Sequence, residues 1–322
     1  MRYAGWLGIL LLVAQSAGAE ATRQEQFEAL KQEGDTTRAL AFVEDWLKSS
    51  PDDPDVYVTA ANYYIDASTR SQMTVNTARR GNFDVSVRRE GENPQFQLLD
   101  PKTKKVVGSI GSETVVEDPE IADKALEVLL EAHRRFPHRM DISFGICYHY
   151  KEAGDFEHFI QMLDDATSYA VAHPEKLKWM KNAPLSDKPE EFIPRTLHEY
   201  CKQFMALQQP EEEEHARRVA EVAVRYYPGH PYAYNDIAGY YSFRKEYKKT
   251  LEYLMKAHVV APKDVLVICN IGHIHDVMGD KAAACEWFQK AQPLTTDPDM
   301  KENIADAVKE LCGKKKAKTG KR

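Results

Sequence analysis

Two consecutive segments between Pro231 and Thr296 repeat one residue pattern at a spacing of 34 residues. The first segment carries, in order, Tyr234, Ile237, Ala238, Tyr241, Thr250, Leu254, Ala257 and Pro262. The second carries Ile268, Ile271, Gly272, His275, Ala284, Phe288, Ala291 and Thr296 at the same offsets. Positions that agree in type at one fixed spacing indicate a repeated structural unit, and this repeat constrains the fold more than any other feature of the chain.

The pattern resembles the tetratricopeptide repeat (TPR), a helix–turn–helix unit with this period and with small residues where its two helices cross. The resemblance implies antiparallel helix pairs that stack into a right-handed superhelix, with the first helices lining a concave groove. The predicted fold class is therefore all-α. We expect a TPR-type α-solenoid of about six helix pairs with a C-terminal capping helix and a small β-hairpin insertion inside the second repeat.

Extending the same period in both directions predicts the other units of a solenoid over residues 20–312. The six units span residues 20–53, 54–67 continued by 118–139, 140–173, 197–230, 231–264 and 265–298. Residues 174–196 form an irregular connector, although Asp187 and Pro189 favour an earlier start of the helix that follows. Asp299–Leu311 is amphipathic and is predicted to cap the last pair, as residues 299–312.

The insertion at residues 68–117 does not have the residue pattern of a helix. Phe83, Val85 and Val87 alternate with polar residues, and Asp100 with Pro101 indicates a turn before a second apolar run. These features predict a hairpin or a small three-stranded sheet. The stretch Ser71–Gly81 is expected to contribute little packing.

The first 19 residues have the pattern of a secretory signal peptide. Arg2 precedes a short apolar run, and Ala17-Gly18-Ala19 follows as a cleavage site. A membrane anchor is the alternative, but the apolar run is too short to span a bilayer. We expect cleavage after Ala19 and a periplasmic or secreted location, and the lack of Asn-x-Ser/Thr sequons favours a bacterial periplasm.

The charge is distributed unevenly along the chain. The net charge is −7, although six of the positive charges lie in the tail at residues 313–322. The body is therefore more acidic than the whole, which argues against nucleic-acid binding. The basic tail is expected to be disordered. It acts either as a solubilising end or through weak electrostatic contact with an anionic surface.

Five cysteines follow the leader, and their spacing matches no zinc or redox motif. The simplest interpretation is that they are small buried hydrophobic residues, which suits Cys147 at a helix-crossing position. A disulfide between Cys285 and Cys312 is a second hypothesis, because the final helix should pack on the helix that carries Cys285.

In the TPR family, exposed positions of the first helices bind an extended peptide or a partner helix. Mapped onto this chain, the resemblance predicts a partner-binding groove formed by His198, Lys202, Tyr232, Asn235, Asp236, Asn270 and His273. The two asparagines suit main-chain recognition, because an amide offers a donor and an acceptor together. No Lys or Arg occupies these positions in the last two units, so the carboxylate clamp of one TPR subclass is not expected.

No catalytic, cofactor-binding or metal-binding residues are predicted. His273 and His275 are two residues apart, so a helix directs them to different sides and they should not share one metal ion. No phosphate-binding glycine loop or nucleophile motif is present.

Two functions are compatible with the sequence. The first is a non-enzymatic periplasmic scaffold or adaptor that binds another envelope protein or peptide through the groove and the β insertion. The alternative is a module for a small ligand or polysaccharide, or a cryptic enzyme, that uses the Tyr, His and Asn side chains of the groove.

Overall fold

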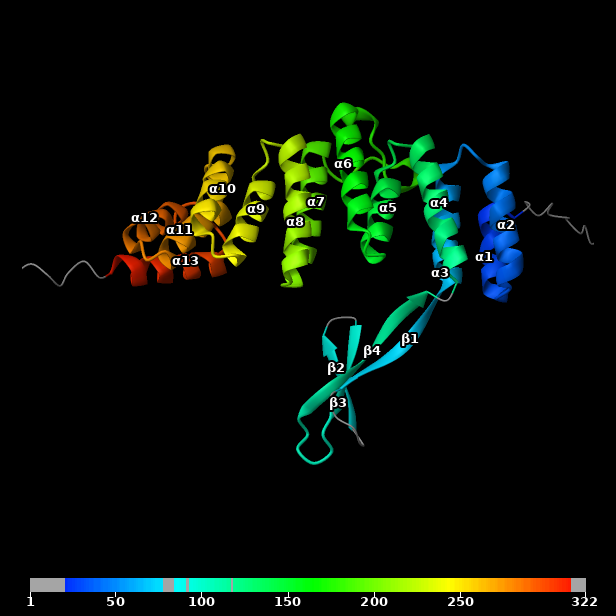
Figure 1. Ribbon diagram of the computed structural model, residues 1–322, viewed down its shortest axis with the longest axis horizontal. Helices are drawn as coiled ribbons and strands as arrows, with labels where there is room; N and C mark the ends of the chain where they lie inside the picture. The colour runs from blue at the N-terminus through cyan, green and yellow to red at the C-terminus, as the bar shows by residue number, and fades with distance from the viewer. Residues whose placement is uncertain (1–20, 78–83, 91–92, 117, 314–322) are drawn as a thin grey trace, which may run out of the picture. The chain divides into compact units, whose positions relative to one another are not determined.

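The computed structural model describes residues 21–77, 84–90, 93–116 and 118–313 (Figure 1). The predicted signal peptide and almost all of the basic tail therefore lie outside the described residues. The chain divides into two compact units, Met1–Ala122 and Asp123–Arg322. No described helix combines the length and apolar character needed to cross a bilayer.

The first unit contains the helices α1 (Arg23–Glu33), α2 (Thr36–Ser49) and α3 (Pro54–Ser68). Thr22 and Glu25 form a capping box that begins α1, and Gly34 ends it in the left-handed conformation that glycine adopts most readily. Phe27 is buried and packs edge-on against Tyr63, with ring centroids 5.1 Å apart. This aromatic contact joins the first helix to the third.

A four-stranded antiparallel sheet follows α3. Its strands are β1 (Thr69–Thr77), β2 (Asp84–Glu90), β3 (Asn93–Leu99) and β4 (Val106–Val116), in the order β1-β4-β3-β2. Asp100 shapes the predicted turn, since its Oδ1 accepts hydrogen bonds from the backbone N–H groups of Lys102 and Thr103, at 3.0 and 2.7 Å.

The sheet has one strand more than the largest predicted sheet. Thr69–Thr77 pairs with β4 along its whole length, so residues 71–77 form a strand that was not predicted from the sequence. The strand is polar and lacks the alternation that identifies half-buried strands. Its pairing depends on backbone hydrogen bonds to β4, which side-chain patterning does not reveal.

The second unit is built from helices. They are α4 (Pro119–Arg135, which begins at the end of the first unit), α5 (Met140–Glu152), α6 (Phe156–Ala172), α7 (Pro189–Ala206), α8 (Pro210–Tyr226), α9 (Pro231–Phe243), α10 (Tyr247–Val260), α11 (Val265–Val277), α12 (Lys281–Ala291) and α13 (Pro298–Cys312). The pairing of α3 with α4 as one repeat remains a prediction.

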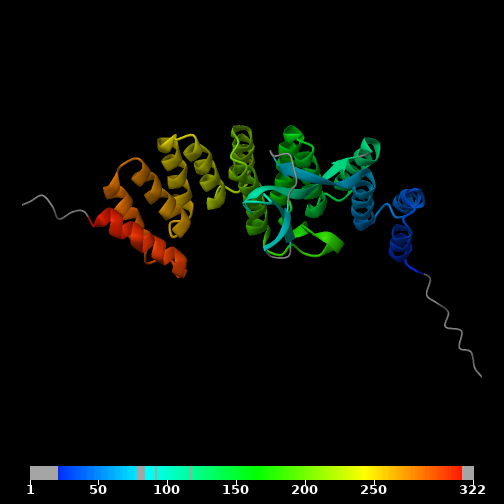
Figure 2. The same cartoon turned by 90° about the horizontal axis from the view of Figure 1, so that it is seen from below.

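Successive helices pack as pairs: α5 with α6, α7 with α8, α9 with α10, and α11 with α12. The pairs follow one another in chain order from green to orange, and α13 follows in red (Figure 2). First helices also contact first helices, as α7 does α9, and second helices contact second helices, as α6 does α8. This arrangement confirms the predicted fold class, an all-α TPR-type solenoid.

The segment between α6 and α7 is anchored to the start of α5. The backbone N–H of Met140 donates to the carbonyl of Lys178 at 3.0 Å. The ring centroids of Trp179 and of Phe192 on α7 are 5.4 Å apart. The predicted connector ended at residue 196, whereas α7 begins at Pro189, close to the helix start that Asp187 and Pro189 favoured.

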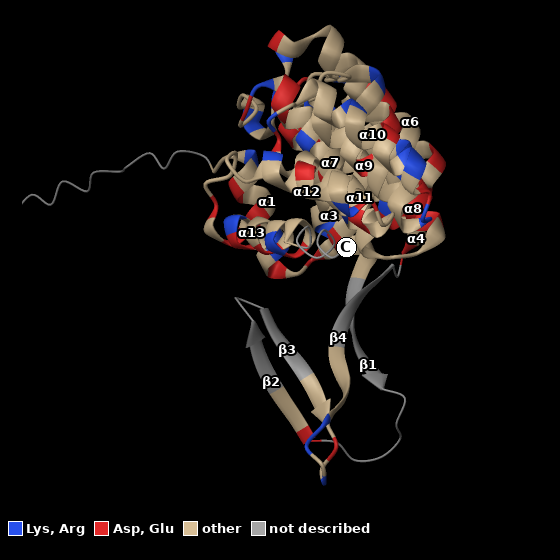
Figure 3. Ribbon diagram, turned by 90° about the vertical axis from the view of Figure 1, so that its left-hand side faces the viewer, with Lys and Arg blue, Asp and Glu red and all other residues tan. Residues whose placement is uncertain are grey.

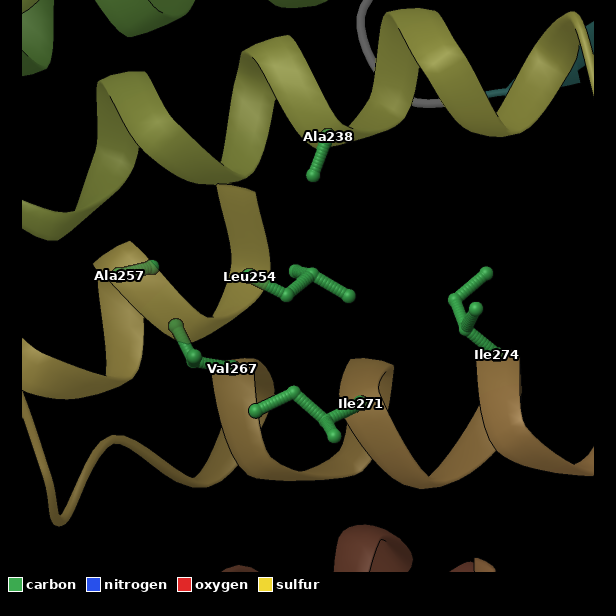
Figure 4. Close-up of a cluster of buried hydrophobic side chains, with 6 residues drawn as sticks. All are labelled: Ala238, Leu254, Ala257, Val267, Ile271 and Ile274. Carbon is green, nitrogen blue, oxygen red and sulfur yellow. The ribbon is translucent and has the colours of Figure 1, made fainter. Parts of the chain in front are cut away.

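The core between the last two pairs uses the repeated positions. Figure 4 shows Leu254 of α10 lying between Ala238 of α9 and Ile271 of α11, and all three side chains are buried. Close crossing depends on small residues: a Cβ at Gly272 would come within 3.1 Å of the Phe288 ring. The 34-residue pattern is therefore a packing pattern.

Helix α13 covers the end of the last pair. Its Ile304 is buried with Ile268 of α11 and Ala291 of α12. A disulfide joins Cys285 of α12 to Cys312 at the end of α13, with the Cα atoms 5.4 Å apart. The structure thus contains the disulfide that was one of two hypotheses for these cysteines.

The disulfide predicts a thiol count. Cys147, Cys201 and Cys269 are free, so the denatured protein should show three thiols before reduction and five after it.

A disulfide that closes a loop of this size stabilises a fold by about 2–4 kcal/mol. The double variant Cys285→Ala/Cys312→Ala should lower the free energy of unfolding by that amount in urea titration. An unchanged thiol count on reduction would contradict the bridge, and Cys269→Ala, which leaves it intact, is the control.

Candidate partner-binding groove

The predicted groove residues lie on three consecutive first helices. His198 and Lys202 belong to α7, Tyr232, Asn235 and Asp236 to α9, and Asn270 and His273 to α11. Figure 3 shows basic and acidic segments interspersed along the helices. The described helices present no block of a single charge in this view, so the candidate site is characterised by its individual side chains.

Asn235 and Asn270 meet across neighbouring helices. The Nδ2 of Asn270 donates a hydrogen bond of 2.8 Å to the Oδ1 of Asn235. Both side chains line a cavity of about 150 Å³, together with Gly239, Ser242 and His273. The structure thus brings together three of the seven predicted residues: Asn235, Asn270 and His273.

The asparagine pair retains hydrogen-bonding capacity for a ligand. Within the described chain, the Nδ2 of Asn235 and the Oδ1 of Asn270 have no protein partner. One amide donor and one carbonyl acceptor are what an extended peptide backbone requires. His273 is exposed beside them and adds a ring nitrogen at the rim.

Asp236 is not exposed to the groove. Its side chain is only 9% exposed, and both carboxylate oxygens lie 2.9 Å from the Nδ1 of His198. Burial lowers the pKa of His198, but the hydrogen bond and the charge of Asp236 outweigh burial, so this pKa lies above its ordinary value. The pair forms an internal link between α7 and α9.

Lys202 also lies apart from the cavity. Its Nζ is 3.0 Å from both carboxylate oxygens of Glu199 on the same helix. A pair of exposed side chains of this kind contributes little to stability. The structure therefore separates Lys202 and Asp236 from the asparagine cavity, although the repeat places all of them on first helices.

Tyr232 is partly exposed, and histidine rings lie close to it. The ring centroids of His198 and His230 are 4.7 and 4.5 Å from that of Tyr232. Burial lowers the pKa of His230, which favours its neutral form. These neighbours leave less of the tyrosine ring available for stacking on a ligand.

Ser242 belongs to the cavity but was not predicted. It lies seven residues after Asn235, on the same side of α9, so helical spacing from the predicted residue Asn235 could have identified it. His230 was also missed, although its contact with Tyr232 is local: it is the N-cap of α9, and its Nδ1 accepts a hydrogen bond of 3.4 Å from the backbone N–H of Tyr232.

The buried cysteine of α7, Cys201, is not arranged for nucleophilic chemistry. Burial raises the pKa of the Cys201 thiol well above its usual range, and the thiol donates to the carbonyl of Ala216 at 3.3 Å. A neutral, buried thiol is a poor nucleophile. In the part of the chain that the structure describes, no three His, Cys, Asp or Glu side chains gather as metal ligands.

Comparisons with known proteins give similarity in structure alone. No family model matches the chain, and no curated protein matches it in sequence. Similar solved structures include the Sgt2 TPR domain from Aspergillus fumigatus, which is 20% identical, covers 40% of this chain and 87% of its own, and has a TM-score of 0.31. The translocator chaperone SycD of Yersinia enterocolitica is 14% identical over 38% of this chain and 88% of its own, with a TM-score of 0.34.

A third similar structure is MamA 41-end from Desulfovibrio magneticus RS-1. It is 19% identical and covers 53% of this chain and 84% of its own, with a TM-score of 0.30. The fold assignment rests on the helix pairs of this chain.

The link between His198 and Asp236 predicts a measurable titration. In Asp236→Asn, the His198 pKa should fall below its ordinary value, because the charge is lost while burial remains. The His198 ring also interacts electrostatically with Glu199, Lys202 and His230, which are unchanged in this variant. NMR titration of the histidine ring protons measures the shift.

The sign of the pH dependence follows from the raised pKa. The contribution of His198 to stability is fully present below its unfolded pKa of about 6.5 and is lost as pH rises through its higher folded pKa. Asp155→Asn is the matched control, since Asp155 pairs with the exposed His158 at 2.7 Å. An unchanged His198 titration in Asp236→Asn would contradict the assignment.

Proposed function

We propose that this protein is a non-enzymatic scaffold or adaptor of the cell envelope that holds a segment of another protein in its groove. The observation that carries the proposal is the cavity at Asn235 and Asn270, with an unused donor and an unused acceptor on adjacent first helices. A cavity of about 150 Å³ is small for an organic substrate but can take part of a peptide chain.

The amide pair favours recognition of a peptide backbone. The two asparagines hold each other in place, so little side-chain entropy is lost when a ligand binds. Because a backbone presents alternating N–H and C=O groups, the pair binds many sequences, and specificity must come from neighbouring residues.

The β insertion supports the same function through strand addition. Strand β1 is an edge of the sheet, paired on one side with β4, and Arg70 is its single charged residue. The opposite edge, β2, carries Asp84, Arg88, Arg89 and Glu90. Charged residues on an edge strand discourage pairing, so β1 is the edge that suits a partner strand.

The envelope location is supported by the leader-like residues 1–19. A small-ligand or polysaccharide module remains the second candidate through the exposed part of Tyr232. It is the weaker one, because His198 and His230 already contact that ring.

The groove proposal is tested by photo-crosslinking in intact cells. Asn235→Ala/Asn270→Ala should reduce the yield of crosslinked partner at least about tenfold, since two hydrogen-bonding groups are lost at about 1 kcal/mol or more each. The yield is measured by quantitative mass spectrometry of the purified adducts.

Gln289→Ala is the matched control, because this exposed amide lies on the second helix α12. A variant lacking residues 69–116 tests the sheet separately. Equal yields from wild type, the double asparagine variant and the sheet deletion would rule out both surfaces.

The location has its own test. We expect the mature chain to begin at Glu20 and to be found in the periplasmic or secreted fraction. Intact-mass measurement after fractionation checks both points. A chain that retains residues 1–19 in the cytoplasmic fraction would contradict the envelope proposal.

A further inference from the structure

A second hollow lies between α11, α12 and α13, with a volume of about 400 Å³. Phe288 and the buried Ile304 belong to its wall, and Leu266, Cys269 and Met300 contribute further apolar surface. Leu266 is 58% exposed, so it presents apolar surface at the opening of the hollow. The size and lining suit one large apolar side chain.

The rim of this hollow is acidic. Of its lining residues, Asp297, Asp299 and Asn303 are polar, and none is basic. Asp297 begins α13, and its Oδ1 accepts from the backbone N–H of Met300 at 2.8 Å. Asp299 has no ion-pair or hydrogen-bond partner among the residues that the structure describes, so its carboxylate is available at the rim.

The hollow continues the groove that contains the asparagine cavity. Leu266 and Cys269 line the hollow, while Asn270 and His273 line the cavity. These four residues follow the spacing of one face of α11, so both sites open on the same side of that helix. An extended peptide of a few residues can therefore occupy both.

The occupant is a segment of another protein and not the tail of this chain. Residues 313–322 are basic, but Ala317 is their largest apolar residue and would leave the hollow unfilled. An acidic partner segment is disfavoured, because Asp299 would repel its carboxylates.

We infer that the hollow at α11 and α13 selects partner segments in which a large apolar residue stands next to Lys or Arg. The apolar side chain enters between Leu266, Phe288 and Ile304, and the cation pairs with Asp299 at the rim. The inference rests on the proposed function, because it names the class of segment that the groove binds.

The test uses an array of immobilised octapeptides that differ only in a central pair: Leu-Lys, Leu-Glu, Ser-Lys or Ser-Glu. Purified full-length protein should be retained by Leu-Lys at least tenfold more than by any of the others. In Asp299→Lys, the preference between Leu-Lys and Leu-Glu should reverse, which a purely structural role of Asp299 would not produce. Leu266→Ser should reduce the advantage of Leu over Ser at least threefold.

Asp306→Lys is the matched control, because it makes the same charge change at an exposed carboxylate of α13 that does not line the hollow, and it should leave the preference unchanged. Peptide retention that depends on Asn235 and Asn270 but is equal for Leu-Lys and Leu-Glu would overturn this inference and keep the proposed function. Retention of no peptide would overturn both. Loss of the Leu-Lys preference at high salt is expected, since exposed charges are screened.

Discussion

The structure depends on the packing of each helix pair against the next. Leu254 and Ala257 of α10 are buried with Ala238 of α9 and with Val267, Ile271 and Ile274 of α11, so the core belongs to two repeats at once. One pair alone would expose the apolar face that it buries against its neighbour. The last pair meets the same requirement through Ile304 of α13, and the Cys285–Cys312 disulfide ties that helix in place.

Because packing uses one set of repeated positions, the remaining positions of the first helices are open to variation. Successive repeats fill them with different chemistry. The position of His198 in one unit is taken by Tyr232, Leu266 and Met300 at steps of 34 residues. At this position His198 forms an internal link to Asp236, whereas Leu266 and Met300 give apolar surface beside the hollow. The first helices thus repeat in geometry and differ in chemistry from one unit to the next.

The asparagine pair shows how far the sequence could predict this groove. Asn235 and Asn270 were predicted from their repeat positions. In the structure the Nδ2 of Asn270 lies 2.8 Å from the Oδ1 of Asn235, and His273 lines the same cavity. Asp236 has an equally favourable position in the repeat, but its carboxylate is buried against His198. Repeat position specifies the helix face, whereas a charged side chain near the edge of that face can turn inward when a neighbouring helix offers a partner.

The sequence by itself determined the period and the fold class, because small and large apolar residues at fixed spacing specify how the helix pairs pack. It also suggested the Cys285–Cys312 pair through the expected contact of the last two helices. Only the tertiary structure decided which side chains meet. The hollow between α11 and α13 and the pairing of β1 with β4 depend on residues far apart in sequence, and no local pattern records such contacts.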